Sequence, residues 1–339
     1  MNWSQVGYVS EPINDQYIKL THVLCSHSFT RHKSSILNPE LCDYCFETKS
    51  VSQDKVALRE WISSIIDHEI IYQDKSILKN GFEIDILIPR LKLGIEYNGL
   101  YWHSEEIGKS KWYHSTKHNK CAEQGIRLIQ IFEDEWLYKQ NIVKTRLRHI
   151  LKLNQQPSKI SARKCIVESI QSSVAKLFHE KYHIQGRGTG TVAYALIYQN
   201  DIVAVMDFAP LSRAKGQRAK DGNWELTRFS VNGHIPGAAG KLFSAFIKSH
   251  DPESIISYSD CRWNTGTVYE RLGFIKQGTT TPNYWYIEGN KRHHRYKYRK
   301  DQLIKEGFDF NKTEREIMQE RGFKRIWDCG HDKWIWSRK

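Results

Sequence analysis

Two acidic residues stand in apolar segments that each predict a β-strand. Asp85 lies in Ile-Asp-Ile-Leu-Ile at residues 84–88, and Glu96 lies in Leu-Gly-Ile-Glu-Tyr at residues 93–97. A carboxylate in an apolar strand is costly unless it is paired or bound to a cation, and a hairpin would bring both acids to one end of a sheet. Since hard cations prefer carboxylates, the pair predicts a magnesium site. The alternative is that either acid points to solvent from an edge strand.

Such a site suits the hydrolysis of phosphodiesters, because a divalent cation binds the scissile phosphate and lowers the pKa of an attacking water. His103 is our candidate for the proton transfer, since imidazole titrates near neutrality. It could instead simply pack beside Trp102. Lys117 could place a positive charge near the phosphate and contact DNA, or it could be solvated on a polar helix.

Four residues of the first fifty predict a structural zinc site. His22 and Cys25 form a His-x2-Cys pair, and Cys42 and Cys45 form a Cys-x2-Cys pair. Zinc prefers a tetrahedral shell of nitrogen and sulfur, and each x2 spacing can supply two ligands from one turn. His27 competes with His22 for the fourth place. The alternative is free thiols beside surface histidines.

The elements that must position these side chains follow from hydrophobic periodicity. The first half predicts, in order, a helix, a hairpin, a helix, a strand and a helix. A polar stretch with a proline then predicts a linker. The segments are residues 52–66, 81–89, 91–99, 117–124, 126–132 and 134–153, with the linker at 154–160.

The second half predicts a hairpin, a strand, a loop of small residues that enters a helix, and a further strand and helix. A loop of this kind exposes backbone N–H groups at the positive end of a helix, which suits phosphates. A capped helix and two strands end the chain. The segments are residues 193–198, 202–208, 224–230, 234–241, 242–249, 255–260, 264–274, 313–322, 326–328 and 333–336.

Three segments occur together in order: Phe82–Asp85, Gly94–His103 and Ile126–Trp136. Together they resemble the very-short-patch mismatch repair endonucleases and the related phage homing endonucleases, including the Hef-like group, within the PD-(D/E)XK superfamily. The resemblance implies a restriction-endonuclease-like fold and Mg²⁺-dependent cleavage of double-stranded DNA. It also implies that Asp85 binds the metal and that His103 is catalytic near the phosphate.

Other positions fit this resemblance less closely. Glu96 matches the second acid of the broader class. Asn98 stands where the repair enzymes have histidine and the broader class has lysine, so the residue that activates the water stays open. Glu60 is the nearest fit to an acid that related homing enzymes carry on their first helix. Glu133 follows the third strand as acids do in the family, or it caps the next helix.

The second half resembles the acyl-CoA-dependent GNAT acyltransferases. The resemblance rests on the Gly237-Ala-Ala-Gly240 loop, which would take the pyrophosphate place, and on the segment Asn264–Phe274 after the preceding strand. Fold analogy does not carry activity, and no convincing general base is present. Three acids could be offered for that role, although each fits a strand end or turn better: Asp207, Glu225 and Asp260.

The charge predicts a polyanionic partner. The formal charge is +13, and residues 291–300 combine basic side chains with two tyrosines, which suits DNA phosphates and bases. The alternative is a solvated basic surface. The candidate DNA contacts in this run are Arg292, Arg295, Lys297, Arg299 and Lys300.

These observations predict a mixed α/β chain of three parts. They are a zinc-ribbon-like module at 1–50, a repair-endonuclease-like domain at 51–153, and a GNAT-like α+β domain with a basic extension at 161–339. The predicted function is a Mg²⁺-dependent DNA endonuclease of the phage homing type. The alternative is an acyltransferase that uses acetyl-CoA to modify nucleic acid or protein. Oligomeric state stays open.

Seven irregularly spaced cysteines and the lack of a long apolar run favour a reducing compartment and exclude a membrane span. We therefore expect a cytoplasmic location, in the host cell if a phage encodes the chain.

Overall fold

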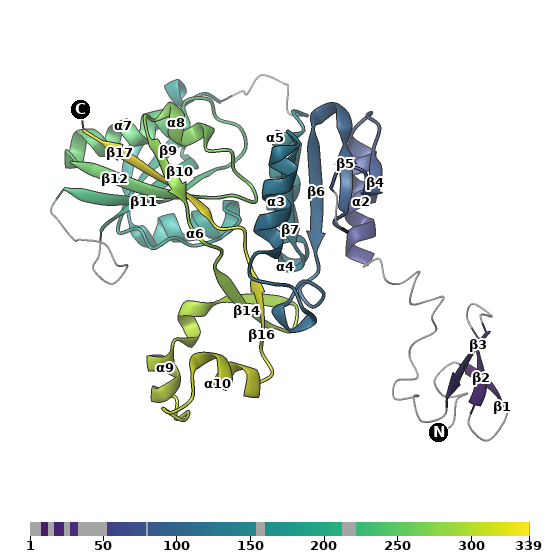
Figure 1. Cartoon of the computed structure of the whole chain (residues 1–339). Coiled ribbons are helices and arrows are strands. Elements are labelled where there is room, and N and C mark those ends of the chain that lie inside the picture. The colour runs from purple at the N-terminus through teal and green to yellow at the C-terminus, as the bar shows by residue number, and fades with distance from the viewer. Residues whose placement is uncertain are drawn as a thin grey trace. The chain divides into compact units, whose positions relative to one another are not determined.

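The computed structural model describes residues 8–12, 17–23, 28–32, 53–78, 81–153, 160–211 and 222–338. The chain divides into two compact units, Met1–Asp67 and His68–Lys339 (Figure 1). The sequence placed a boundary near residue 50, whereas this division follows Asp67. In the part described, no helix is long and apolar enough to cross a membrane.

The described residues of the first unit form an antiparallel sheet and the helix α2. The strands β1 (Tyr8–Pro12), β2 (Tyr17–His22) and β3 (Ser28–His32) pair in that order. Helix α2 (Gln53–Ile65) buries Leu58 and Ile62. Of the predicted zinc ligands, His22 ends β2. The others, Cys25, Cys42 and Cys45, lie outside the described residues, as does His27.

The second unit begins with a four-stranded sheet in the order β4-β5-β6-β7. The first three strands are antiparallel neighbours, whereas β6 and β7 are parallel. Parallel neighbours need a crossover, which helix α3 (Tyr113–Glu123) supplies. Every residue of β5 and β6 is buried, so the sheet is covered on both faces. The strands are β4 (Ile71–Asp74), β5 (Ile84–Ile88), β6 (Leu93–Asn98) and β7 (Arg127–Phe132).

Two helices follow β7 where the sequence predicted one helix over residues 134–153. They are α4 (Glu133–Tyr138) and α5 (Gln140–Ile150). Lys139 separates them with φ −131° and ψ 29°, outside the helical region. Its ammonium donates a hydrogen bond to the carbonyl of Ile184 at 2.9 Å, so a contact with the following domain accompanies the break.

A seven-stranded sheet forms most of the rest, in the order β13-β17-β12-β11-β10-β9-β8. Only β11 and β12 are parallel, and α7 (Ala238–His250) connects them. Helix α6 (Ser172–Tyr182) joins β8 to β9, and α8 (Thr267–Arg271) precedes β13. The strands are β8 (Ile166–Ile170), β9 (Val192–Tyr198), β10 (Asp201–Pro210), β11 (Asn223–Val231), β12 (Ser254–Asp260), β13 (Ile275–Thr279) and β17 (His331–Ser337).

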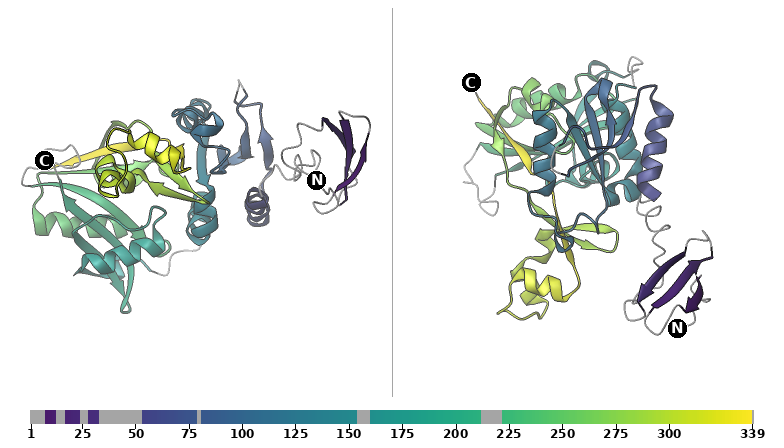
Figure 2. Two further views of the ribbon diagram at one scale, coloured as in Figure 1. Left: turned by 90° about the horizontal axis from the view of Figure 1, so that it is seen from below. Right: turned by 45° about the vertical axis from the view of Figure 1, so that its right-hand side comes forward.

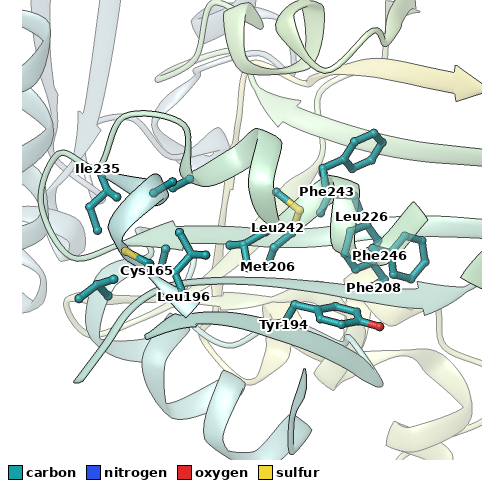
Figure 3. Packing of buried hydrophobic residues seen from close by; sticks show 14 of the residues in the cluster. Cys165, Tyr194, Leu196, Met206, Phe208, Leu226, Ile235, Leu242, Phe243 and Phe246 are labelled. Atoms are coloured by element: carbon teal, nitrogen blue, oxygen red, sulfur yellow. The ribbon is translucent and has the colours of Figure 1, made fainter. Parts of the chain in front are cut away.

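Alternation along the strands builds two cores, one on each face of this sheet. Met206 and Phe208 of β10 face α7, and Phe208 stacks on Phe246 with ring centroids 3.6 Å apart (Figure 3). Val205 faces the other way, toward Phe178 of α6. Successive side chains of a strand point to opposite faces, so one strand serves both helices. Full burial of a phenylalanine is worth about 1.5–3 kcal/mol.

A small subdomain, residues 284–327, is inserted between β13 and β17. The strand order of its sheet is β15-β14-β16, and its own core joins Tyr286 and Tyr298 to residues of two helices. The sequence expected residues 326–328 to complete the second domain, but β16 pairs with β14 instead. Its elements are β14 (Tyr284–Glu288), β15 (Lys291–His294), η7 (Arg295–Tyr298), α9 (Lys300–Lys305), α10 (Glu314–Glu320) and β16 (Lys324–Trp327), green to yellow in Figure 2.

Candidate active site

Asp85 and Glu96 lie on the same face of the β5–β6 hairpin. The antiparallel register pairs Ile86 with Ile95, and its continuation places Asp85 opposite Glu96, where side chains share a face. Both acids are buried, with 2% and 3% of their surfaces exposed. The backbone N–H of Tyr97 donates to Asp85 Oδ2 at 2.8 Å. The two acids therefore lie side by side, as the sequence predicted, and neither points to solvent from an edge strand.

Lys117 enters this cluster from α3. Its Nζ lies 2.5 Å from Glu96 Oε1, and only 1% of the residue is exposed. Burial alone would lower the pKa of Lys117, but the charge and hydrogen bond of Glu96 outweigh it and hold the pKa above its usual value. A surface DNA contact is therefore wrong for this lysine. Its ammonium instead neutralises one carboxylate of the pair.

Asn98 extends the same face of β6, two residues beyond Glu96. It is fully buried, and its Nδ2 donates to Gln130 Oε1 on β7 at 3.2 Å. Asn98 Oδ1 is buried without a hydrogen-bond partner. A buried carbonyl oxygen without a donor is costly, so this atom is suited to accept a cation, a water or a substrate donor.

The donors present fit a magnesium ion. In the part of the chain described, no three His, Cys, Asp or Glu side chains gather as a metal site. Magnesium, however, is commonly held by one or two carboxylates, with waters and substrate phosphates completing the shell. Asp85, Glu96 and the Oδ1 atom of Asn98 supply oxygens from one face of the sheet.

His103 lies in the loop that follows β6, among aromatic rings. Its ring centroid is 5.6 Å from that of Tyr113, and its Nδ1 is 3.1 Å from Nε2 of His114. Tyr113 also feels the charges of Asp85 and Glu96. Burial raises the pKa of Tyr113, and the two acids add to the effect. Tyr113 therefore contacts the ring of the predicted histidine and lies within the electrostatic influence of the predicted acids.

Glu133 holds this loop against the end of β7. Its Oε2 accepts a hydrogen bond from the backbone N–H of Leu100 at 2.8 Å. The cap of α4 is made by Glu135, which accepts from the N–H of Phe132 at 3.1 Å. Glu133 is thus placed to fix the position of the loop that carries His103.

The 284–327 subdomain packs against this loop and against the end of β7. Ile287 and Ile326 share a buried cluster with Leu100 and Phe132. Glu105, just beyond His103, accepts two hydrogen bonds of 2.8 Å from the guanidinium of Arg325. The edge of the sheet where β6 and β7 end is therefore covered by a part of the chain that lies about 200 residues later.

Arg262 joins the four-stranded sheet to the larger domain. Its guanidinium lies 2.9 Å from Glu135 and 2.7 Å from Asp260, and all three side chains are nearly buried. Burial alone would raise the pKa of Asp260, but Arg262, with a smaller contribution from His331, lowers it to about 2. The carboxylates are thus ionised and fully paired.

The basic run of residues 291–300 divides into two kinds of side chain. The side chain of Arg292 is 7% exposed and pairs with Asp134 at 2.8 Å and with Glu135 at 3.0 Å. Its assignment as a DNA contact is therefore wrong, because the two acids hold it inside the fold. Arg295 is half-buried over a tyrosine ring. Of the candidate DNA contacts, the exposed ones are Lys297, Arg299 and Lys300.

Glu60 is exposed on α2 in the first unit. The structure does not place it with the acids of the second unit, so its assignment stays a prediction.

The GNAT-like features of the larger domain have a separate geometry. β11 and β12 pair from Asn223 and Ser254 to Leu226 and Ser257. Beyond these residues both strands continue but no longer pair with each other, so they separate there. The helix N-terminus predicted for a pyrophosphate begins at Gly237, whose φ is +82°, a value that favours glycine.

The chain itself covers one side of this loop. The backbone N–H of Ala162 donates to the carbonyl of Pro236 at 3.0 Å, and Lys241 Nζ donates to the carbonyls of Ala162 and Cys165. A Cβ at Gly237 would meet Ala162 at 3.4 Å. The short helix η5 (Ala162–Lys164) thus occupies space beside the loop.

Two of the three acids offered as bases are held inside the fold. Asp207 is 1% exposed, accepts a 2.5 Å hydrogen bond from Thr227, and is packed so tightly that a Cβ at Gly190 would lie 2.4 Å from it. Asp260 is paired with a guanidinium. Glu225 is half-buried on β11.

Comparisons with known proteins find similar solved structures for about half of the chain. No family model and no curated protein matches the chain. Solved structures that match include an IAA acetyltransferase from Bacillus cereus (10% identity, TM-score 0.28), an aminoglycoside 6'-acetyltransferase type Ii (13%, 0.29) and a Bacillus subtilis acetyltransferase in complex with CoA (10%, 0.30). They cover 51–52% of this chain and 96–100% of their own. At these TM-scores the likeness carries no argument about activity.

Two residues of the candidate site were missed by sequence reasoning. Gln130 is a fully buried polar residue in an apolar strand, so the argument that identified Glu96 would also have found it. His114 is 1% exposed and lies three residues before Lys117. Its spacing puts both on one face of the helix, but the polar sequence of α3 gave no sign that this face is buried.

Proposed function

We propose that this protein is a Mg²⁺-dependent DNA endonuclease. The observation that carries the proposal is the cluster of Asp85, Glu96 and Lys117, three ionisable side chains buried together at the end of a hairpin. Burying charges is costly, and a fold retains such a group where its chemistry is used. We further propose that the chain acts at specific sites, as a phage homing endonuclease does, with zinc stabilising its N-terminal module.

Each side chain then has a distinct role. Asp85, Glu96 and Asn98 Oδ1 would hold magnesium, which when bound supplies charge stabilisation to the phosphate and a more acidic water. Lys117 pairs with Glu96 at 2.5 Å and so offsets the cost of burying its carboxylate. His103 exchanges the proton of the attacking water. The lysine that the broader nuclease class has at position 98 is absent here. The ammonium of Lys117 instead contacts the carboxylate of Glu96 from α3.

The exposed basic residues of the subdomain would hold the DNA backbone. Lys297 lies on η7, and Arg299 lies between η7 and α9. The guanidinium of Arg299 lies over the ring of Tyr296, 3.9 Å from the ring centroid. Cations bound to phosphates release counterions and make affinity depend on salt. A subdomain that packs beside the candidate site is therefore suited to position a DNA duplex.

A cleavage and binding assay tests the proposal. We expect the wild-type chain to cut supercoiled DNA with Mg²⁺ but not with EDTA, and Asp85→Ala to bind the same DNA without cutting it. Glu83→Ala is the matched control, because Glu83 lies two residues away, is partly exposed and pairs with Lys75 at 3.8 Å. Cutting by Asp85→Ala at the wild-type rate would refute the assignment.

An acyltransferase that modifies nucleic acid or protein is the second candidate. It is favoured by the separation of β11 from β12 next to a loop that enters α7. The buried Asp207 and the covered side of the Gly237 loop count against it. Acetyl-CoA binding decides between the two candidates. It can be measured by calorimetric titration and by the shift in melting temperature. Saturable binding would support the second candidate, whereas no heat and no shift would remove it.

A further inference from the structure

The side-chain amide of Gln130 is held in one orientation by its neighbours. Gln130 is fully buried in β7, and its Nε2 donates to the backbone carbonyl of His114 at 3.0 Å. A carbonyl oxygen carries lone pairs and no hydrogen, so a reversed amide would bring two acceptors together. Nε2 also donates to Sγ of Cys329 at 3.0 Å. The NH₂ group therefore faces these two acceptors, and the amide oxygen faces away from them.

The fixed amide of Gln130 determines the orientation of Asn98. Gln130 Oε1 accepts a hydrogen bond from Asn98 Nδ2 at 3.2 Å. A reversed Asn98 would place its own oxygen against Gln130 Oε1, again without a hydrogen between the two acceptors. Nitrogen and oxygen leave the amide carbon in different directions, so Asn98 Oδ1 does not face Gln130.

The atom of Asn98 that is left without a partner is therefore its oxygen. Asn98 is 0% exposed, and its Oδ1 accepts no hydrogen bond. An unmatched buried acceptor costs free energy, and native proteins rarely retain one unless a water, an ion or a ligand supplies the missing partner. Asn98 also shares a face of β6 with Glu96. An oxygen beside this carboxylate attracts a cation, whereas an NH₂ group there would repel it.

We propose that Gln130 is a positioning residue that presents the oxygen of Asn98, rather than its NH₂ group, to the magnesium of the candidate site. The inference rests on the proposed nuclease function and deepens it, because it makes metal affinity depend on a residue that is not a ligand. The two ends of an amide have similar size, and only the oxygen can bind a hard cation. The hydrogen bonds that run from the carbonyl of His114 through Gln130 select that end.

The same contacts tie the orientation to distant parts of the chain. His114 lies on α3, three residues before Lys117, whose ammonium pairs with Glu96 at 2.5 Å. Helix α3 thus supplies both the charge beside the acid and the carbonyl that orients the amides. Cys329 lies between β16 and β17, 199 residues after Gln130. The end of the chain therefore also contributes to the arrangement of the site.

The orientation can be tested without metal or catalysis. In the full chain labelled with ²H and ¹⁵N, the side-chain amide of Asn98 gives a pair of proton signals that Asn98→Asp removes. Gln130→Met removes the acceptor and should speed exchange of these protons with solvent about tenfold, the factor that one hydrogen bond supplies. Gln130→Glu keeps an acceptor oxygen and should retain most of the protection. Equal exchange in Gln130→Met and wild type would overturn the proposal.

A metal titration separates the orientation of the amide from packing. Mn²⁺ replaces Mg²⁺ as a probe visible by electron paramagnetic resonance, and no DNA is needed. We expect Gln130→Met to weaken Mn²⁺ binding roughly 10–100-fold, as the loss of a residue that orients a ligand does. In the Asn98→Asp background the same substitution should have little effect, since a carboxylate presents oxygen in either orientation. Gln124→Met, at an exposed position, is the matched control and should bind as the wild type does.

The wild type supplies a test that needs no substitution at Gln130. Bound Mn²⁺ should broaden the amide signals of Asn98, and sharp signals at saturating Mn²⁺ would overturn the proposal. Wild-type affinity in Gln130→Met, or an equal loss in both backgrounds, would overturn it as well. Failure of the nuclease assignment would be seen separately, as a wild type that meets these expectations for binding and exchange but does not cut DNA.

Discussion

Replacing Lys117 by methionine removes the cation from a buried pair while keeping the length of the side chain. Glu96 would then be left 3% exposed without the ammonium that lies 2.5 Å away. Breaking a buried ion pair from one side costs about 3–5 kcal/mol. At roughly 2–4 °C per kcal/mol for domains of this size, we expect the melting temperature at pH 7 to fall by about 6–20 °C.

The double variant Glu96→Gln/Lys117→Met identifies the cause. It removes both charges, so it should melt much closer to the wild type than Lys117→Met does, although it should not cleave DNA. The single variant has a further signature. Without its cation the buried Glu96 should have a raised pKa, so the folded state gains protons relative to the unfolded state and the lost stability returns as pH falls.

Thermal melts and urea titrations at several pH values measure these effects. A Lys117→Met variant that melts within a degree of the wild type would show that the pair is not buried as described. A double variant no more stable than the single one would show that lost packing, rather than an uncompensated charge, explains the change.

Three further predictions concern the domain contacts and the DNA surface. Arg262→Met leaves the buried Asp260 without its guanidinium partner and Glu135 with Arg292 alone. It should lower the free energy of unfolding by about 3–5 kcal/mol in urea, and a loss smaller than 1 kcal/mol would contradict it. Because the pKa of Asp260 is about 2 when folded and near 3.9 when unfolded, its stabilisation is complete above that range and lost as pH falls through it. Melts of the wild type between pH 4 and 2 should show this dependence, and Arg262→Met should weaken it. Lys297→Ala and Arg299→Ala should each weaken DNA binding regardless of sequence and reduce the salt slope by about 1; an unchanged slope in a salt titration would exclude a phosphate contact.

The acids of the site could be found in the sequence because each breaks a local rule. Asp85 and Glu96 stand in apolar strands, and a polar residue that interrupts such a strand needs a partner. The turn that joins the two strands is formed by neighbouring residues. Pro89 starts a short 3₁₀ helix, and Lys92 adopts a left-handed conformation with φ 48°. Short-range signals of this kind are sufficient to place two side chains on one face.

The partners that complete the site could not be found in this way. Lys117 is 21 residues from Glu96, on a helix whose polar sequence resembles a solvated one, and its burial follows from packing alone. Arg292 belongs to a basic run, yet its partner Asp134 lies 158 residues earlier. Similarly, β16 pairs with β14 rather than with a strand of the seven-stranded sheet. The sequence of residues 324–327 does not show which of the two sheets the strand joins.

The most direct test of the central claim is the rate at which purified protein cuts DNA as the Mg²⁺ concentration is raised. Wild type and the control Glu83→Ala should give the same saturating curve on supercoiled plasmid and on phage genomic DNA. Asp85→Asn, which keeps the shape of the side chain but loses its charge, should give no Mg²⁺-dependent cutting while still retarding the DNA in a gel. Equal curves for Asp85→Asn and wild type, or no cutting by any of the three, would contradict the account.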